Sequence, residues 1–590
     1  MKRFAAHILP LALSAVLLTP AHAAEPARRP NVVVILADDQ GWGDLSIHGN
    51  KNLETPRIDS LGRDGALFEH FYVCPVCSPT RAEFLTGRWH PRGGVWSTST
   101  GGERLDLDER TIAQAFQAAG YATGAFGKWH NGTQWPYHPN ARGFAEYFGF
   151  TSGHWGQYFH PLLERNGQTV QPPGYITDVL TDEALKFIET HRGGPFFCYL
   201  PFNTPHSPMQ VPDRFYEKFA DAPLPMRFQD PSKEELPMTR AALAMVENID
   251  WNVGRVLDKL DELKLAEDTI VLYFSDNGPN SFRWNGGLRG RKASTDEGGV
   301  RSPCLVRWPG QIPPGKRIKS IAGAVDLLPT LAELARVPVT DCKPLDGMSM
   351  SPWLRGTATD LPYRMIFSHW NGKVSVRSQR FRLSDDGKLY HIDADPGQLY
   401  NVSAQHPIAT KRLTKAVESW SDELLKGLRD DQRPLTVGYR EFPLTNLPAR
   451  DAVSHGNIQR SARAPNCSFL RNWTSVDDKI TWNVEVATPG RYEAIIYYTC
   501  VPENVGAVVE LSLGAGRVEA KVNEAHDPPL VGAADDRVPR QGESYVKDFR
   551  PWSMGQLTLA QGRGTLTLRA LSIPGKEAID VRGVSLKLMD

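Results

Sequence analysis

An uninterrupted apolar run at residues 32–37, VVVILA, is the feature that most constrains the fold. Such β-branched runs are typical of strands that are buried on both faces of a parallel sheet. Comparable runs recur after helix-like stretches: ATGAFGKW at 122–129, FFCYLPF at 196–202, TIVLYFSD at 269–276 and SPCLVRW at 302–308. This alternation predicts an α/β fold with a mostly parallel central sheet flanked by helices.

Two of the predicted strands end in polar oxygen-bearing side chains. The first is followed by Asp38 and Asp39, and a later strand is followed by Asp276 and Asn277. Parallel strands bring their carboxyl ends to one edge of the sheet, where ligands bind in such folds. Carboxylate and amide oxygens suit a hard cation such as Ca²⁺ or Mg²⁺. Taken singly, the same residues also shape turns after strands.

The segment CPVCSPTRAEFLTGR, residues 74–88, joins two cysteines to a predicted short helix. Pro79 suits the first helical turn, with Ser78 as a candidate cap and Gly87 as a stop. Cys77 then lies just before a helix N-terminus, where we expect a lowered thiol pKa. The chain has no second CxxC pair to complete a zinc site, which leaves a redox pair as the alternative.

The same segment carries a family resemblance. Residues 77–81, CSPTR, match the C-x-P-x-R signature of the type I, formylglycine-dependent sulfatases, and LTGR follows at 85–88. Further motifs of that family occur in order: PNVVVILADDQGWGD at 30–44, TPRIDSLGRDGALFEHFY at 55–72, GKWH at 127–130, NTPHSP at 203–208, SDNG at 275–278 and RGRKASTDEGGVRSP at 289–303. The chain therefore resembles arylsulfatase-like members of the alkaline phosphatase superfamily over about residues 30–430.

The resemblance implies a modified residue and a metal ion. In the family a formylglycine-generating enzyme oxidises the signature cysteine to 3-oxoalanine, so Cys77 is the expected precursor of the nucleophile. One hydroxyl of the hydrated aldehyde would attack sulfur, and deprotonation of the other would expel sulfate. The implied ion is Ca²⁺, with these ligands: Asp38, Asp39, Cys77 after its modification, Asp276 and Asn277.

Five cationic or titratable residues complete the implied site. Arg81 and Lys128 are expected to hold the formylglycine hydroxyls and to balance negative charge around the metal. His130 is the expected base, since imidazole titrates near neutral pH. His206 and Lys292, together with Lys128, are expected to bind the sulfate and stabilise its developing charge. Each of these side chains, considered alone, also fits an ordinary surface or turn role.

Other residues near the motifs have less specific interpretations. Glu297 and Arg301 are interpreted as a structural ion pair within the EGGVR turn. Ser152 and His154 occupy a loop where family members often place a pocket residue. His138 lies in another loop that is a candidate to face substrate.

Seven cysteines, an odd number, leave at least one unpaired. Cys74 is interpreted as a small buried residue near the site. A disulfide between Cys74 and Cys77 would block formylglycine formation in an exported protein. Cys467 and Cys500 are a candidate disulfide in the C-terminal part of the chain.

The N-terminus predicts export. Lys2 and Arg3 precede an apolar run at 8–18, and Ala-His-Ala at 21–23 suits cleavage, as in a secretory signal peptide covering residues 1–23. The protein is expected to be periplasmic or secreted. A membrane anchor is the alternative, but the run is short for one. With 67 basic and 67 acidic residues, there is no net charge to attract nucleic acid or an anionic membrane.

The pattern changes near the end of the family resemblance. Residues 24–435 are assigned to a catalytic domain, which includes a smaller C-terminal subdomain from about 360. Residues 436–590 alternate apolar and polar residues between Gly and Pro turns, as in KITWNVEVAT at 479–488. That alternation predicts an all-β sandwich.

The predicted sandwich has two candidate roles. Its W-x-V-x-V-x-x-P-G-x-Y pattern resembles carbohydrate-binding modules of polysaccharide enzymes, whereas a structural or subunit-contact role is the alternative. Sugar binding would require an exposed Trp473 or Trp552 to stack on a ring.

The sequence therefore predicts an exported sulfatase that converts a sulfate ester, on a sulfated carbohydrate, to an alcohol and inorganic sulfate. One alternative is a phosphodiesterase or phosphonate monoester hydrolase of the same superfamily, because sulfate and phosphate share a tetrahedral shape. The other is a non-catalytic glycan-binding protein that keeps the fold.

Overall fold

A ten-stranded mixed sheet forms the centre of the larger domain in the computed structural model, which describes residues 1, 29–428 and 433–589. The predicted signal peptide, apart from Met1, lies outside the described residues. Among the helices that are described, every one is too short or too polar to cross a membrane.

The strands of this sheet follow the order β12-β2-β11-β9-β1-β8-β4-β5-β6-β7. Its five central strands run parallel: β9 (Thr269–Ser275), β1 (Asn31–Ala37), β8 (Phe196–Pro201), β4 (Ala122–Lys128) and β5 (Glu146–Phe150). The flanking strands are β12 (Lys316–Ile318), β2 (Ala66–Phe68), β11 (Cys304–Arg307), β6 (Leu163–Arg165) and β7 (Gln168–Val170). β11 pairs antiparallel with β9, so the predicted strand at 302–308 lies beyond the parallel part. The mostly parallel α/β fold predicted from the sequence is confirmed.

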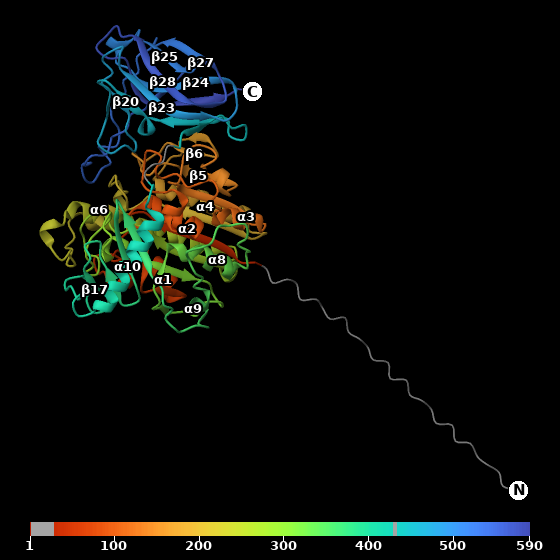
Figure 1. Cartoon of the computed structure of the whole chain (residues 1–590), viewed down its shortest axis with the longest axis vertical. Helices are drawn as coiled ribbons and strands as arrows, with labels where there is room; N and C mark the ends of the chain where they lie inside the picture. The colour runs from red at the N-terminus through yellow and green to blue at the C-terminus, as the bar shows by residue number, and fades with distance from the viewer. Residues whose placement is uncertain (2–28, 429–432, 590) are drawn as a thin grey trace.

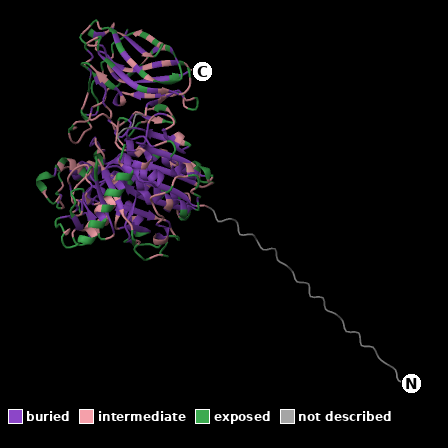
Figure 2. Cartoon of the chain, in the orientation of Figure 1, coloured by how far each residue is buried: buried purple, intermediate pink, exposed green. Residues whose placement is uncertain are grey.

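Every residue of β1 is buried, because the strand has a helical layer on each face. Val33 and Ile35 belong to one apolar core, and Val32 and Val34 belong to the other. Side chains alternate across a strand, so a strand covered on both sides needs apolar residues at every position. Figure 2 shows buried residues gathered in the middle of the larger domain.

Helices cover the two faces in separate groups. One face carries α1 (Pro56–Arg63), α4 (Ile176–Thr190) and α6 (Leu236–Glu262), with α5 (Asp213–Ala220) against α6. The other carries α2 (Cys77–Thr86), α3 (Ile112–Ala118) and α8 (Leu327–Ala335), with α9 (Ser351–Arg355) against α8. A short helix, α7 (Glu297–Val300), precedes β10 (Arg301–Ser302), which joins β3 (Phe71–Tyr72) and β13 (Ala322–Gly323) in a three-stranded sheet.

A four-stranded antiparallel sheet follows these elements in the chain. It comprises β14 (Ile366–Trp370), β15 (Lys373–Arg377), β16 (Phe381–Leu383) and β17 (Leu389–His391), and α10 (Pro407–Leu424) packs on it. In Figure 1 this unit lies at the side of the larger domain away from the blue C-terminal domain.

The C-terminal domain consists of two six-stranded sheets that enclose an apolar core. One sheet contains β18 (Leu435–Val437), β20 (Val453–His455), β23 (Lys479–Val486), β25 (Val508–Leu513), β26 (Gly516–Lys521) and β28 (Gly562–Ser572). The other contains β19 (Leu444–Pro448), β21 (Gln459–Arg460), β22 (Leu470–Arg471), β24 (Gly490–Thr499), β27 (Arg550–Leu559) and β29 (Asp580–Leu588). These β-rich sheets agree with the predicted sandwich.

Two candidate features of this domain can be compared with the structure. Trp473 is only 1% exposed and packs in the core, so it is no platform for a sugar ring, whereas Trp552 is partly buried against Tyr498. Cys467 and Cys500 are both free thiols. The predicted disulfide is wrong because each sulfur faces a backbone carbonyl instead: Cys467 Sγ lies 3.2 Å from His154 O, and Cys500 Sγ lies 3.4 Å from Val501 O.

A long connection between β26 and β27 returns from the sandwich to the larger domain. The backbone N–H of Arg537 donates to Met209 O at 2.8 Å, and Gln210 Nε2 donates to Asp536 Oδ1 at the same distance. Arg540 Nη2 donates to Gly156 O at 2.7 Å. These contacts place part of the second domain beside the carboxyl edge of the catalytic sheet.

Candidate active site

The four predicted oxygen ligands lie together at the carboxyl edge of the sheet: Asp38, Asp39, Asp276 and Asn277. β1 and β9 pair in parallel with Ala37 opposite Ser275, so the residues after both strands leave the sheet side by side. The backbone N–H of Asp276 donates to Ala37 O at 3.1 Å, and that of Asp39 donates to Asp276 Oδ1 at 3.2 Å. Strand pairing thus assembles the group.

Two oxygens in this group are buried and lack a hydrogen-bond partner among the described residues, Asp38 Oδ1 and Asn277 Oδ1. The amide nitrogen of Asn277 donates to Asp39 Oδ1 at 2.7 Å and to Gly278 O at 2.9 Å, so its oxygen is the open atom. Open acceptors in a buried site are costly unless something positive binds them. The residues therefore fit a hard cation such as Ca²⁺.

Cys77 is the first residue of α2 and borders this group. Its Sγ lies within 4.8 Å of carboxylate oxygens of both Asp38 and Asp276. The helix begins two residues earlier than predicted, with Val76 rather than Ser78 at the cap, and it ends at Gly87 as predicted. The residue is buried, with 3% of its surface exposed.

The predicted lowering of the Cys77 pKa is wrong for the unmodified thiol. Burial raises that pKa, and it outweighs the opposing effects of Lys128 and Lys292. Burial destabilises the thiolate by removing it from water. This effect is larger than the stabilisation of the thiolate by the helix N-terminus and the two lysines. Unmodified Cys77 therefore does not have the lowered thiol pKa that is typical of reactive cysteines.

Arg81 and Lys128 bind the inner carboxylates. Lys128 Nζ lies 2.6 Å from Asp38 Oδ2, and Arg81 donates to Asp276 Oδ2 from Nη2 at 2.7 Å. Arg81 Nη1 also donates to Lys128 O at 2.7 Å, which ties α2 to the end of β4. Burial acts to raise the pKa of Asp38, but Lys128 and its neighbours hold it well below the usual range. Burial and the nearby Asp38 raise the pKa of Asp276 to about 7.

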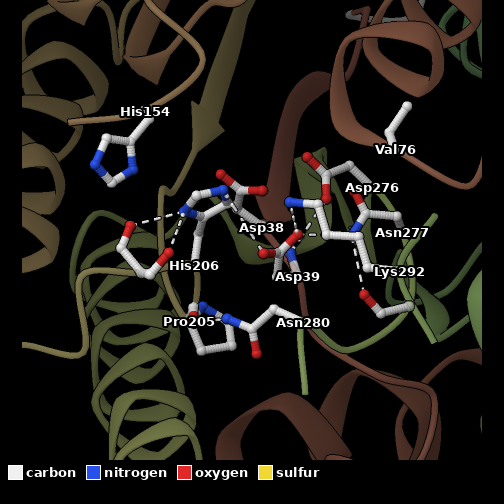
Figure 3. A network of polar contacts seen from close by, with 12 residues as sticks. Asp38, Asp39, Val76, His154, Pro205, His206, Asp276, Asn277, Asn280 and Lys292 are labelled. Atoms are coloured by element: carbon white, nitrogen blue, oxygen red, sulfur yellow. Dashed lines mark hydrogen bonds and ion pairs between the residues drawn. The ribbon is translucent and has the colours of Figure 1, made fainter. Parts of the chain in front are cut away.

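Lys292 and His206 stand on the outer side of the group. Lys292 Nζ lies 2.6 Å from Asp39 Oδ1, and His206 Nε2 lies 3.7 Å from Asp39 Oδ2 (Figure 3). Their side chains are 20% and 13% exposed, whereas those of Arg81 and Lys128 are fully enclosed. The outer pair is therefore the one that a substrate reaches from solvent.

His130 follows β4 in a left-handed conformation with φ of 67°. Its Nε2 lies 2.7 Å from Thr98 O, and its Nδ1 is buried without a hydrogen-bond partner among the described residues. A carbonyl oxygen only accepts, so Nε2 carries the proton and Nδ1 is an open acceptor. Burial lowers the pKa of His130 well below its ordinary value, which keeps the ring neutral. A side chain at Gly153 would clash with this ring.

A model of the Sulfatase family matches residues 30–337 of the chain. The chain belongs to the sulfatase family. N-acetylgalactosamine-6-sulfatase of Mus musculus is 32% identical over 499 residues, covering 72% of this chain and 91% of that protein. Arylsulfatase A of Homo sapiens is 30% identical over 505 residues, covering 73% and 93% respectively. The solved structure of Ps i-CgsB in complex with k-i-k-neocarrahexaose is 30% identical, with a TM-score of 0.61 over 67% of this chain and 93% of that one.

The protein is thus an arylsulfatase-like member of the alkaline phosphatase superfamily and a sulfuric ester hydrolase. In this sulfatase, Glu297 is the centre of a second buried charged group. Its Oε1 accepts from Arg382 Nε at 2.8 Å and its Oε2 accepts from the Tyr72 hydroxyl at 3.1 Å. Arg377 and Arg301 lie 3.5 and 3.9 Å from its carboxylate. The predicted pair of Glu297 and Arg301 is one edge of this network, in which Arg382 makes the shorter contact.

The predicted loop candidates have different surroundings. Ser152 is engaged by Arg450 of the C-terminal domain. His138 Nε2 lies 2.6 Å from Glu164 Oε1, a contact that holds a loop beside β6. His154 packs beside His206, with 5.4 Å between the ring centroids, and is the one of the three that borders the site.

Sequence reasoning missed two contributors to the sulfatase site. Thr80 Oγ1 donates to Asp276 O at 2.6 Å and accepts from the N–H of Cys74 at 2.8 Å, which fixes α2 against the end of β9. Glu543, from the C-terminal domain, accepts from Ser207 Oγ at 2.6 Å. Thr80 lies within the signature segment and was open to prediction, whereas no sequence pattern links Glu543 to Ser207.

Cys74 is buried and free, so the structure holds no disulfide between Cys74 and Cys77. Its thiol contacts the Glu83 carboxyl on α2. Burial raises the pKa of Glu83 to about 8, so this acid is protonated at neutral pH. The small buried residue predicted at Cys74 is therefore one half of a neutral polar pair behind the site.

Proposed function

We propose that the sulfatase is exported, that Cys77 is converted to 3-oxoalanine by a formylglycine-generating enzyme, and that it hydrolyses sulfate esters of a saccharide with Ca²⁺ bound. The observation that carries this proposal is the position of Cys77 beside carboxylate oxygens of Asp38 and Asp276, in a group that has two open oxygens and that Lys128 and Lys292 influence electrostatically. A modified side chain there would meet both the ion and the cations.

Asp38, Asp39, Asp276 and Asn277 would hold the ion, which lowers the pKa of an oxygen group bound to it. The hydrated aldehyde at position 77 would supply one hydroxyl as nucleophile and a second whose deprotonation expels sulfate. Transfer of a sulfuryl group requires a nucleophile and a cation next to each other, and this site would provide both.

The chain's own residues bind and orient the substrate. Lys292 and His206 reach solvent and would bind two sulfate oxygens, while Lys128 would face a third from the inner side. His130 Nδ1, an open acceptor on a neutral ring, would take the proton from the second hydroxyl. Arg81, held against Asp276, keeps positive charge beside the reacting group without reaching solvent.

A saccharide substrate is supported by the similar proteins. N-acetylgalactosamine-6-sulfatase is named after a sugar, and the structure of Ps i-CgsB was solved in complex with k-i-k-neocarrahexaose. The open outer side of the site, where Lys292 and His206 stand, leaves room for a large leaving group.

The test combines mass spectrometry with kinetics. The peptide that contains residue 77 is expected to be lighter than its cysteine form, and purified protein is expected to release sulfate from a panel of sulfated oligosaccharides. An aryl phosphodiester is the comparison substrate. Preference for the phosphodiester, or sulfate release at background in fully converted protein, would contradict the proposal.

Export has a separate test. The N-terminal residue of protein recovered from outside the cytoplasm is expected to lie near Ala24. Retention of the full N-terminus in the cytoplasm would contradict it.

A further inference from the structure

The connection between β26 and β27 brings the Glu543 carboxylate of the C-terminal domain next to Ser207 and His154, beside His206. Glu543 Oε1 accepts from Ser207 Oγ at 2.6 Å and lies 3.7 Å from His154 Nδ1. Ser207 directly follows His206 in the chain, and His154 lies beside His206 in Figure 3. The second domain therefore touches the outer, substrate-facing side of the site.

His154 is a polar side chain without a hydrogen-bond partner at this contact. It is 5% exposed, and both ring nitrogens lack a partner among the described residues. Buried polar groups in native proteins are hydrogen-bonded, so an open pair of nitrogens next to a solvent-accessible carboxylate indicates that a polar ligand belongs there. Glu543 itself is 21% exposed.

A cleft of about 370 Å³ opens at the same place and is lined from both domains. From the catalytic domain its lining includes Ser207, Asn280, Phe282 and Arg291, and from the C-terminal domain Arg540 and Glu543. Ligand pockets for small molecules start near this volume, which suits one or two sugar rings. Asn280 also donates to Pro205 O at 3.3 Å, and Figure 3 shows both residues below Asp39 and His206.

The cleft contains polar groups with room to bind. Arg291, next to Lys292 in the chain, donates to Asn280 O at 2.8 Å and lies over the Phe282 ring. Among the described residues it forms no ion pair with a carboxylate. Arg540, in contrast, is paired with Asp536 at 2.9 Å and fixes the connection in place. Arg540 and Arg537 thus hold the connection against the other domain. Glu543 adds one hydrogen bond, from Ser207 Oγ to its Oε1, and its Oε2 accepts no hydrogen bond from the described residues.

We propose that Glu543 is a specificity-determining residue of this sulfatase, which accepts hydrogen bonds from hydroxyl groups of the sugar that carries the sulfate. The C-terminal domain then forms one wall of the substrate cleft. A carboxylate accepts two or more hydrogen bonds and repels anions, so it suits ring hydroxyls and disfavours a second sulfate at that wall. This inference rests on the proposed saccharide substrate.

The experiment compares E543A and E543Q with the parent enzyme on a sulfated oligosaccharide and on a small aryl sulfate. E543A is expected to lower kcat/KM about tenfold on the oligosaccharide, mainly through KM, and less than about threefold on the aryl sulfate, which lacks sugar hydroxyls. E543Q keeps the shape and one acceptor oxygen, so its loss is expected to be intermediate.

E503Q is the matched control, since Glu503 is exposed on the same domain and does not line the cleft. It is expected to leave both rates unchanged, and thermal unfolding of all variants checks that they fold. An equal loss on both substrates would overturn the inference, because it would assign Glu543 to the chemistry or to the fold. No change on the oligosaccharide would also overturn it. If the parent enzyme cleaves the aryl sulfate but no saccharide, the proposed substrate class itself fails.

Discussion

Two buried charged groups in the catalytic domain differ in which atoms they leave open. The strand-end group, built on Asp38, Asp39, Asp276 and Asn277, leaves two acceptor oxygens without a partner. The Glu297 group uses both carboxylate oxygens, and its open atoms are the donors Arg377 Nη2 and Arg382 Nη2. Open acceptors attract a cation, whereas a surplus of arginine excludes one. Buried charge alone therefore does not mark a cation site; the strand-end group differs from the Glu297 group by having open acceptor atoms among clustered carboxylates.

The largest expected effect is the loss of the proposed nucleophile. C77A removes the side chain next to the strand-end group but no ion pair, so we expect activity to fall about 10³-fold or more with little change in stability. Sulfate release and urea unfolding measure the two quantities. More than a tenth of the parent activity in C77A would place the chemistry at another residue.

Removing the metal tests the open acceptors directly. A chelator is expected to abolish sulfate release, and excess Ca²⁺ is expected to restore it. Ca²⁺ at 100 times its Kd would stabilise the folded protein by about 2.7 kcal/mol. Differential scanning calorimetry should show this shift in the parent and in E297Q, but not in D38N. An equal shift in D38N would mean that Ca²⁺ binds at another place.

The Glu297 group is expected to act on stability alone. E297Q leaves three arginines without their carboxylate, and breaking such a buried pair costs about 3–5 kcal/mol. Turnover per folded molecule should stay within about threefold of the parent, because no atom of the group reaches substrate. Loss of activity without loss of stability in E297Q would erase the distinction between the two groups.

Lowering the pH should remove the stabilisation that the Glu297 group gives to the parent enzyme. Burial acts to raise the pKa of Glu297, but the arginines, Arg382 foremost, lower it to about 2. Because the folded-state pKa lies below the unfolded one, the stabilisation is complete above about pH 4.5 and is lost as the pH falls toward 2. The difference in unfolding free energy between parent and E297Q should therefore narrow from about 3 kcal/mol at pH 7 to about 1 kcal/mol at pH 3. A constant difference between those pH values would contradict this account.

The sequence predicted the strand-end group because its members follow two strands that pair in register, a relation that hydrophobic runs reveal. It also predicted the sheet, since residues 32–37 of β1 are all apolar. Contacts that depend on distant packing were not open to prediction: Arg382 reaches Glu297 across 85 residues, and Glu543 reaches Ser207 across 336.

Two of the errors, those at Cys77 and Trp473, share one cause, which is that burial is a property of the whole fold. The helix end beside Cys77 was visible in the sequence, but the enclosure that raises its pKa was not. Trp473 was a candidate for sugar stacking only if it were exposed, yet it packs in the sandwich core. The cysteines at 467 and 500 share a domain, but their thiols face separate carbonyls.

The smallest effect concerns a third buried acid, Glu83, which has no ion pair with a described lysine or arginine and stays protonated beside Cys74. C74A removes a thiol that contacts this carboxyl and should cost about 1 kcal/mol more than C198A, which removes a buried thiol on β8. The fraction of residue 77 converted to 3-oxoalanine, measured by mass spectrometry, should match the parent in both variants. Lower conversion in C74A alone would show that Cys74 takes part in maturation, and the neutral pair would then be more than packing behind the strand-end group.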